Sequence, residues 1–107
     1  MRARVKATSI PKEVKEAVWA RDNEHCLLCR KWVPVDNACA HYVSRARMGL
    51  GCEENILTLC PECHRLFDGY MRKQYEPIIK DYLRSKYPGW DEAKIVYSKW
   101  GWAKSDN

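Results

Sequence analysis

Two Cys-x-x-Cys pairs are the feature that most constrains the fold of this chain. Cys26 and Cys29 form the first pair, Cys60 and Cys63 form the second, and 30 residues separate the pairs. Two residues between cysteines let one tight turn direct both sulfurs at a single ion, and two such turns complete a tetrahedron. We therefore expect a closed structural zinc site of four thiolates, rather than a redox dithiol or unrelated buried thiols.

The length of 107 residues leaves room for one compact domain, to whose stability a bound metal would contribute a large share. The sequence has the pattern of neither a signal peptide nor a membrane span, so we expect a cytoplasmic protein without a membrane partner. Disulfides are rare in that compartment, which favours metal ligation by the paired cysteines. The remaining two, Cys39 and Cys52, are interpreted as small buried residues.

The formal net charge of +5 lies entirely in the first half of the chain. Residues 1–50 contain ten Lys or Arg against five Asp or Glu, whereas residues 51–107 contain nine of each. Four thiolates on one zinc ion would lower the net charge to about +3. This mild basic bias is compatible with a polyanionic partner but does not identify one.

Local patterns divide the chain into a flexible basic arm at residues 1–8 and a single domain at residues 9–107. Ser9 and Pro11 predict the start of a helix that ends near residue 21. Turn-forming residues then separate two short strands, near residues 31–33 and 38–43. A second helix is expected from Pro61 to about Asp68, which completes a core at residues 22–70.

Residues 71–107 are expected to form a C-terminal helical extension. An apolar stripe from Tyr75 to Leu83 predicts one amphipathic helix, and Asp91 can cap a last short helix that ends near Tyr97. Trp100 and Trp102 are expected to pack against the core, with stacking on nucleic-acid bases as the alternative.

Four polar residues could form a catalytic group beside the predicted zinc. His41 lies on the second strand, Asn55 ends the loop that follows it, and His64 comes directly after the last cysteine. Asp68 is four residues after His64 and therefore shares its helix face, and such a pair suits a divalent ion. Each residue also has a structural alternative. His41 could be a hydrogen-bonded strand histidine and Asn55 a turn cap. His64 could be a mere neighbour of the zinc, and Asp68 a solvated residue at the helix end.

The residues from Cys26 to Asp68 resemble the HNH nuclease family. The resemblance rests on Cys-x-x-Cys, then Ala-His-Tyr-Val-Ser-Arg, then Gly-Leu-Gly-Cys-Glu-Glu-Asn-Ile-Leu-Thr-Leu-Cys-Pro-Glu-Cys-His. It is greatest to short phage and prophage members with a four-cysteine zinc site, and it covers residues 9–70 well. It implies an α+β fold: a small ββα-metal (His-Me finger) core with structural zinc, flanked by an N-terminal helix and C-terminal helices.

The resemblance also implies a metal-dependent endonuclease that nicks or cleaves double-stranded DNA by phosphodiester hydrolysis. His41 would be the general base, and His64 with Asp68 would hold a catalytic Mg²⁺, Mn²⁺, Ni²⁺ or Zn²⁺ ion. Asn55 would either brace the loop that directs His41 or ligate the same ion. Arg45 and Arg47 are expected to contact the DNA backbone, with ordinary surface charge as the alternative. These phosphate contacts lie beside the expected catalytic centre.

Two residues depart from the family pattern. Many members have Asp or His directly before the base as a metal ligand, whereas this chain has Ala40. Met48 stands where many members have glycine. Ala40 keeps open a second hypothesis, a zinc-knuckle module that binds nucleic acid without cleaving it. The family context further suggests a phage-encoded protein that acts in the host cytoplasm near genome packaging and terminase, as a monomer or weak dimer.

Overall fold

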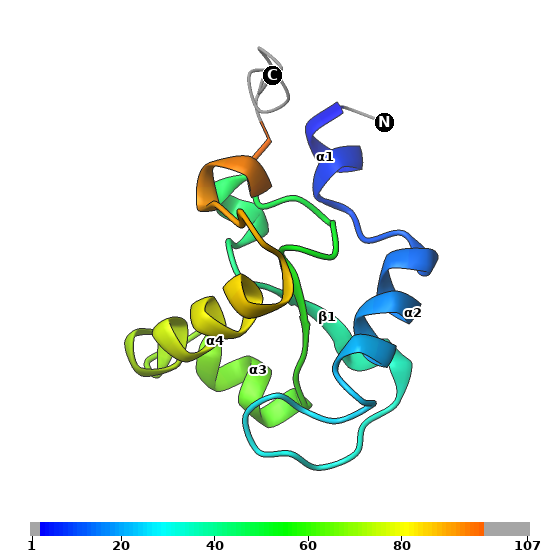
Figure 1. Cartoon of the computed structure of the whole chain (residues 1–107), viewed down its shortest axis with the longest axis vertical. Coiled ribbons are helices and arrows are strands. Elements are labelled where there is room, and N and C mark those ends of the chain that lie inside the picture. The colour runs from blue at the N-terminus through cyan, green and yellow to red at the C-terminus, as the bar shows by residue number, and fades with distance from the viewer. Residues whose placement is uncertain (1–2, 98–107) are drawn as a thin grey trace.

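The computed structural model describes residues 3–97, and Trp100 and Trp102 lie outside the described residues. A two-stranded sheet stands between helices, with α2 on one side and α3 and α4 on the other (Figure 1). The elements in chain order are α1 (Ala3–Thr8), α2 (Lys12–Arg21), the 3-10 turn η1 (Val35–Asn37), β1 (Ala38–His41), the 3-10 turn η2 (Arg45–Arg47), β2 (Ile56–Thr58), α3 (Pro61–Phe67), α4 (Arg72–Lys86) and the 3-10 turn η3 (Glu92–Ile95). The chain thus has the predicted small α+β architecture.

The sheet separates two apolar clusters. Strands β1 and β2 are antiparallel, and the register shifts by one residue at Cys39, between the pairs Ala38–Thr58 and Ala40–Leu57. Because of this irregularity Ala38 packs on the α2 side, while Ala40 faces the larger core on the other side. The α2-side cluster consists of Val18, Ala38 and Ile56, and the larger one includes Ala40, Leu57, Leu59, Phe67, Ile79 and Leu83.

Helices α2 and α3 begin and end close to the predicted positions. Pro11 precedes the first residue of α2, and Pro61 is the first residue of α3, where the missing N–H of proline costs no hydrogen bond. Asp68 caps the C-terminus of α3 rather than continuing it. The predicted helix around Tyr75 is also confirmed, as α4.

Of the two predicted strands, the one near residues 31–33 is not formed and the one near residues 38–43 is shorter than expected; the partner of β1 is instead β2. Residues 31–33 contribute only an isolated bridge between His25 and Trp32, because the chain there closes the turn around the first cysteine pair. The second strand ends at His41, since the backbone N–H of Val43 donates to the side chain of Asn55 at 2.7 Å instead of to a strand. The last predicted helix is the 3-10 turn η3, which Asp91 caps by accepting from Ala93 N at 3.0 Å.

Residues 1–8 contain a helix where the sequence predicted an arm without regular structure. Helix α1 covers Ala3–Thr8, and Thr8 at its end is only 4% exposed. The end of this segment bonds to distant parts of the chain: Gly51 N donates to Ala7 O at 2.9 Å, and His41 Nε2 lies 3.0 Å from Thr8 O. These long-range contacts hold the segment in place, and local sequence patterns cannot predict them. Among the described residues, no helix has the length and apolarity needed to cross a membrane.

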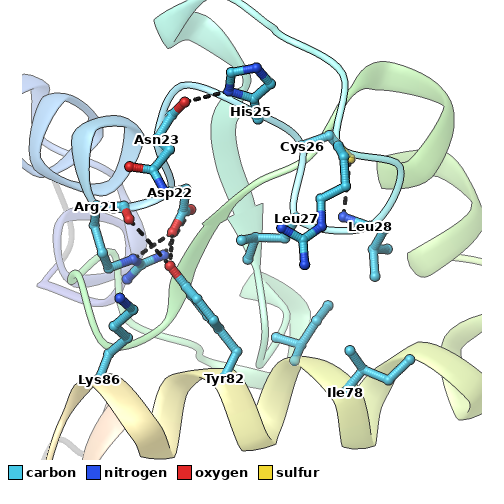
Figure 2. A pocket seen from close by; sticks show the side chains of 12 residues that line it. Arg21, Asp22, Asn23, His25, Cys26, Leu27, Leu28, Ile78, Tyr82 and Lys86 are labelled. Carbon is cyan, nitrogen blue, oxygen red and sulfur yellow. Dashed lines mark hydrogen bonds and ion pairs between the residues drawn. The ribbon is translucent and has the colours of Figure 1, made fainter.

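A buried carboxylate joins α2, β2 and α4. Asp22 is 4% exposed and accepts from Arg21 Nε and Nη2 at 2.7 and 3.0 Å, from Thr58 N at 3.0 Å and from Tyr82 Oη at 2.5 Å. Figure 2 shows the Arg21, Asp22 and Tyr82 side chains converging above α4, to the left of the turn that contains Cys26. The network compensates both charges for their loss of hydration.

Replacing this carboxylate should destabilise the fold strongly. Asp22→Ala leaves the Arg21 guanidinium buried without its counter-ion, and we expect a loss of about 3–5 kcal/mol in the free energy of unfolding. Urea denaturation followed by circular dichroism measures the change. The matched control is Glu16→Ala, which breaks an exposed pair with Lys12 (3.8 Å) and should cost less than about 0.5 kcal/mol. Equal losses in the two variants would contradict a stabilising network at Asp22.

Candidate functional site

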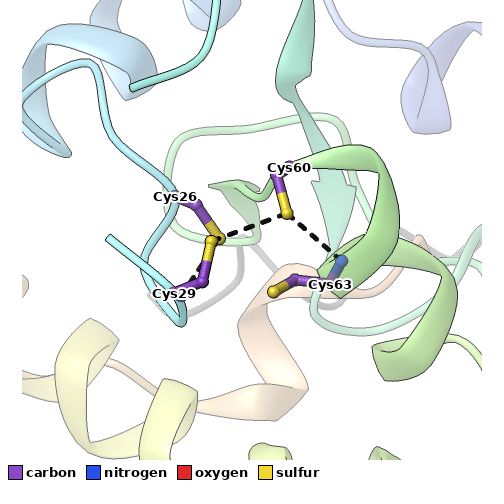
Figure 3. Close-up of side chains that lie close together, drawn as sticks. All are labelled: Cys26, Cys29, Cys60 and Cys63. Carbon is purple, nitrogen blue, oxygen red and sulfur yellow. Dashed lines mark hydrogen bonds between the residues drawn. The ribbon is translucent and has the colours of Figure 1, made fainter. Parts of the chain in front are cut away.

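The four paired cysteines come together as the sequence predicted. Their sulfur atoms all lie within 4.8 Å of one another, and Cys29 Sγ is 3.7 Å from Cys60 Sγ. A tetrahedron with Zn–S bonds of 2.3 Å has edges of about 3.8 Å, so the observed separation suits such an ion. Figure 3 shows one pair on the loop after α2 and the other at the start of α3. The group can therefore hold a metal such as zinc.

Backbone amides are directed at two of these sulfurs, those of Cys26 and Cys60. Leu28 N and Cys29 N lie 3.4 Å from Cys26 Sγ, and Cys63 N lies 3.3 Å from Cys60 Sγ. Burial raises the pKa of Cys26, but N–H donors outweigh it and bring the pKa to about 7. Burial and the neighbouring sulfurs raise the pKa of Cys63 instead. Four adjacent thiolates need a cation among them, and the donor set fits zinc.

A cavity of about 370 Å³ is lined by residues of β1, of η2 and of the end of α3, and none of the four paired cysteines lines it. It brings three of the four predicted catalytic and metal-binding residues together: His41, His64 and Asp68 all contribute to its wall. Arg45 lies in the same wall, whereas Arg47 is exposed and outside it. The cavity thus joins an imidazole on the strand to an imidazole and a carboxylate on the helix.

The His41 ring is held by the backbone of the N-terminal segment. Its Nε2 lies 3.0 Å from Thr8 O, and a carbonyl can only accept, so Nε2 carries the proton in the neutral ring. The Nδ1 lone pair is then the basic one. Burial lowers the pKa of His41, and the nearby charges of Arg45 and His64 lower it further; the Thr8 carbonyl and Asp68 act in the opposite direction.

His64 and Asp68 form a ready pair of nitrogen and oxygen donors. His64 Nε2 is 3.2 Å from Asp68 Oδ2, which is the contact expected for residues four apart on one helix. Both side chains are partly exposed, at 28% and 55%, so they are accessible from the cavity. Cys63, the residue before His64, is directed at the sulfur group instead. Helix α3 therefore places Cys63 at the sulfur group and His64 at the cavity.

Asn55 braces the loop between the strands and does not line the cavity. The side chain is fully buried: Oδ1 accepts from Val43 N at 2.7 Å, and Nδ2 donates to Val43 O at 3.1 Å and Leu50 O at 2.9 Å. A Cβ at Gly49 would come within 2.8 Å of Asn55 Nδ2, so this loop needs a residue without a side chain there. Of the two roles weighed for Asn55, the geometry favours bracing over metal ligation.

The two departures from the expected pattern have structural explanations. Ala40 is fully buried in the larger core, so its methyl group faces away from His41 and the cavity. Met48 follows η2 with a φ of 70°, which places a side chain in the left-handed region that glycine adopts without strain. The loop conformation expected for a glycine is therefore kept despite the methionine.

Sequence analysis missed three residues of the cavity wall. They are Ile10, Cys39 and Ser44. Cys39 is half-buried rather than a core residue, and its position two residues before His41 on one strand was a signal that the two line the same site. Ile10 comes from the segment before α2, which no motif connected with His41. A second cavity of about 360 Å³, between the first cysteine pair and α4, contains none of the predicted catalytic residues (Figure 2).

No protein-family model matches the chain, and no curated protein is significantly similar to it in sequence. Interpretation of the two sites therefore rests on their chemistry.

Metal removal should unfold the domain. A strong chelator or the substitution Cys60→Ser should remove the ion. The binding free energy of such an ion, about 10 kcal/mol or more, is as large as the free energy of unfolding of an ordinary small domain. We expect one metal ion per purified chain by mass spectrometry, and loss of the cooperative thermal transition after its removal. The control is Cys52→Ser, a cysteine outside the sulfur group, which should keep both the ion and the transition. A chelated protein with an unchanged melting curve would refute the structural role.

Proposed function

We propose that this protein is a metal-dependent HNH endonuclease that nicks or cleaves double-stranded DNA by phosphodiester hydrolysis. The observation that supports it best is the cavity shared by His41, His64 and Asp68. General-base catalysis needs a basic nitrogen near the reacting water, and phosphate chemistry needs a positive centre beside it. The cavity offers residues suited to both.

His41 is proposed as the general base. The Thr8 carbonyl holds the proton on Nε2, which leaves Nδ1 to accept a proton from water as it attacks phosphorus. The low pKa keeps the ring neutral near pH 7, so it is ready to accept that proton. Arg45 is the cation of the cavity wall that suits an incoming phosphate.

His64 and Asp68 are proposed to hold the catalytic divalent ion. Imidazole and carboxylate donors together accept Mn²⁺, Ni²⁺ or Zn²⁺ and also tolerate Mg²⁺. When bound, such an ion stabilises negative charge on the phosphate and on the leaving 3′ oxygen. The 3.2 Å separation between His64 Nε2 and Asp68 Oδ2 supports this assignment, because it is short enough for both atoms to ligate one ion.

The four-cysteine group is proposed to hold structural zinc within a ββα-metal core. Strands β1 and β2 and helix α3 would be its two strands and helix, and a closed set of four sulfurs leaves no coordination position for substrate. Arg45 and Arg47 on η2 are proposed to contact the DNA backbone. A phage-encoded role in the host cytoplasm, close to terminase and genome packaging, is proposed from the family resemblance alone.

A non-catalytic zinc-knuckle module is the second candidate, and the position of Ala40 favours it. Where many HNH enzymes have a metal-ligating side chain before the base, this chain has a methyl group buried in the core. Only His64 and Asp68 among the described candidates then remain as donors for a catalytic ion. The two candidates differ in one measurable property, the cleavage of bound DNA.

Supercoiled plasmid tests the nuclease. Nicking should require added Mg²⁺, Mn²⁺, Ni²⁺ or Zn²⁺, and His41→Ala should lower its rate by about 10²–10⁴-fold because the general base is lost. The matched control is His25→Ala, an exposed histidine outside the cavity, which should keep the wild-type rate. Equal nicking by His41→Ala and wild type would exclude this base, and DNA binding without cleavage under every metal would support the module.

The pH dependence of nicking should show the lowered pKa of His41. Only the neutral ring accepts a proton, and burial lowers its pKa from 6.5, so the acid limb of the rate profile should lie below pH 6.5. Arg45→Gln removes a like charge that disfavours protonation, and should therefore move this limb to higher pH. Single-turnover rates with saturating DNA measure both profiles without the effect of Arg45 on binding. A wild-type limb above pH 6.5 would contradict a buried base.

A further inference from the structure

The last two residues of α1 and the two that follow it, residues 7–10, contact the loop after β1 and reach the cavity. We call these residues the strap. Thr8 is 4% exposed, and Ile10 lies in the cavity wall beside His41. Figure 1 shows the strap running from α1 down to α2, on the same side of the sheet as α2. The strap thus reaches the cavity through tertiary contacts, although Thr8 lies more than 30 residues from His41 in sequence.

The strap makes the hydrogen bond that selects the tautomer of His41. Nε2 of the ring lies 3.0 Å from Thr8 O, and no other hydrogen bond of that ring is found among the described residues. In the absence of such a partner a neutral imidazole exchanges its proton between both nitrogens and rotates about its side-chain bonds. The strap therefore determines which nitrogen is basic and where it points.

Two contacts hold the strap in place. Gly51 N donates to Ala7 O at 2.9 Å, and the strap backbone lies so close to Gly51 that a Cβ there would overlap the carbonyl of Ser9. Ile10 packs against the α2-side cluster of Val18, Ala38 and Ile56. The glycine permits the close approach, and the isoleucine supplies the apolar anchor.

We propose that the strap is a positioning element for the catalytic base: by anchoring the Thr8 carbonyl, Gly51 and Ile10 keep Nε2 of His41 protonated and Nδ1 directed into the cavity. The proposal rests on the proposed nuclease function for its effect on rate. The effect on the ring itself does not depend on that function. Gly51 and Ile10 act through the strap and contact no reacting atom, so they are positioning residues.

Two substitutions loosen the strap at opposite ends. Gly51→Ala introduces the Cβ that overlaps Ser9, and Ile10→Ala removes most of the apolar anchor. The matched control is Val14→Ala, which truncates a residue packed on the same α2-side cluster but outside the strap and the cavity. All variants are full-length and metal-loaded, and thermal melts report any general loss of stability. If Gly51→Ala does not fold, Ile10→Ala still tests the proposal.

Two readouts separate positioning from a structural role. Nitrogen-15 NMR of the histidine rings should show a single His41 tautomer, protonated at Nε2, in wild type and Val14→Ala, and a mixture of tautomers in Ile10→Ala and Gly51→Ala. On plasmid DNA the two strap variants should lose tenfold or more in kcat with little change in KM, as expected for a misplaced base. Val14→Ala should keep the wild-type kcat.

The ring spectra decide the proposal even if the protein cleaves nothing. A mixture of tautomers confined to the strap variants, in a protein without nuclease activity, would support the strap and reject the nuclease. Folded Ile10→Ala and Gly51→Ala proteins that both keep the wild-type tautomer would overturn the proposal, and so would an equal change in Val14→Ala.

Discussion

The convergence of four sulfurs on one point is the constraint on which this small fold depends. It links the loop after α2 to the first turn of α3, and β2 leads directly into the second cysteine pair. The hydrogen bond from Leu27 N to Thr58 O, at 3.0 Å, fastens the same loop to the end of β2. A core of this size has little stability to spare, so a metal that closes this junction also fixes the direction in which α3 leaves it. The direction of α3 in turn determines where His64 and Asp68 lie.

A second constraint acts on β1, which must fill the core and present a polar side chain to a cavity within four residues. Regular alternation would place Ala38 and Ala40 on the same face. The irregularity at Cys39 breaks the alternation, so that each alanine fills a different cluster and His41 remains at the cavity. Small side chains suit both positions, because Ala38 and Ala40 are each fully buried in their cluster. Ala40 is therefore explained by packing, whether or not the site binds a catalytic ion.

Local sequence patterns predicted what local physics determines. Proline at a helix start predicted the beginning of α3, and cysteine spacing predicted the sulfur group. The bond between Thr8 and His41 could not be predicted, because it joins residues 33 apart through a backbone atom that carries no sequence signal. For the same reason α1 was taken for an arm. The two roles of Asn55 differ only in the direction of its amide, which no sequence pattern encodes; its hydrogen bonds show that it faces the loop.

On the proposed function, the buried methyl of Ala40 determines how a catalytic ion would be held. His64 and Asp68 supply two donors, and a divalent cation of this kind takes four to six. The remaining positions would fall to water and to oxygen atoms of the DNA phosphate. Such an ion would be bound jointly by protein and substrate, so that DNA and metal would each strengthen the binding of the other. The orientation of His41 by the strap would then be more important for catalysis, because the ion would not position the catalytic residues before DNA binds.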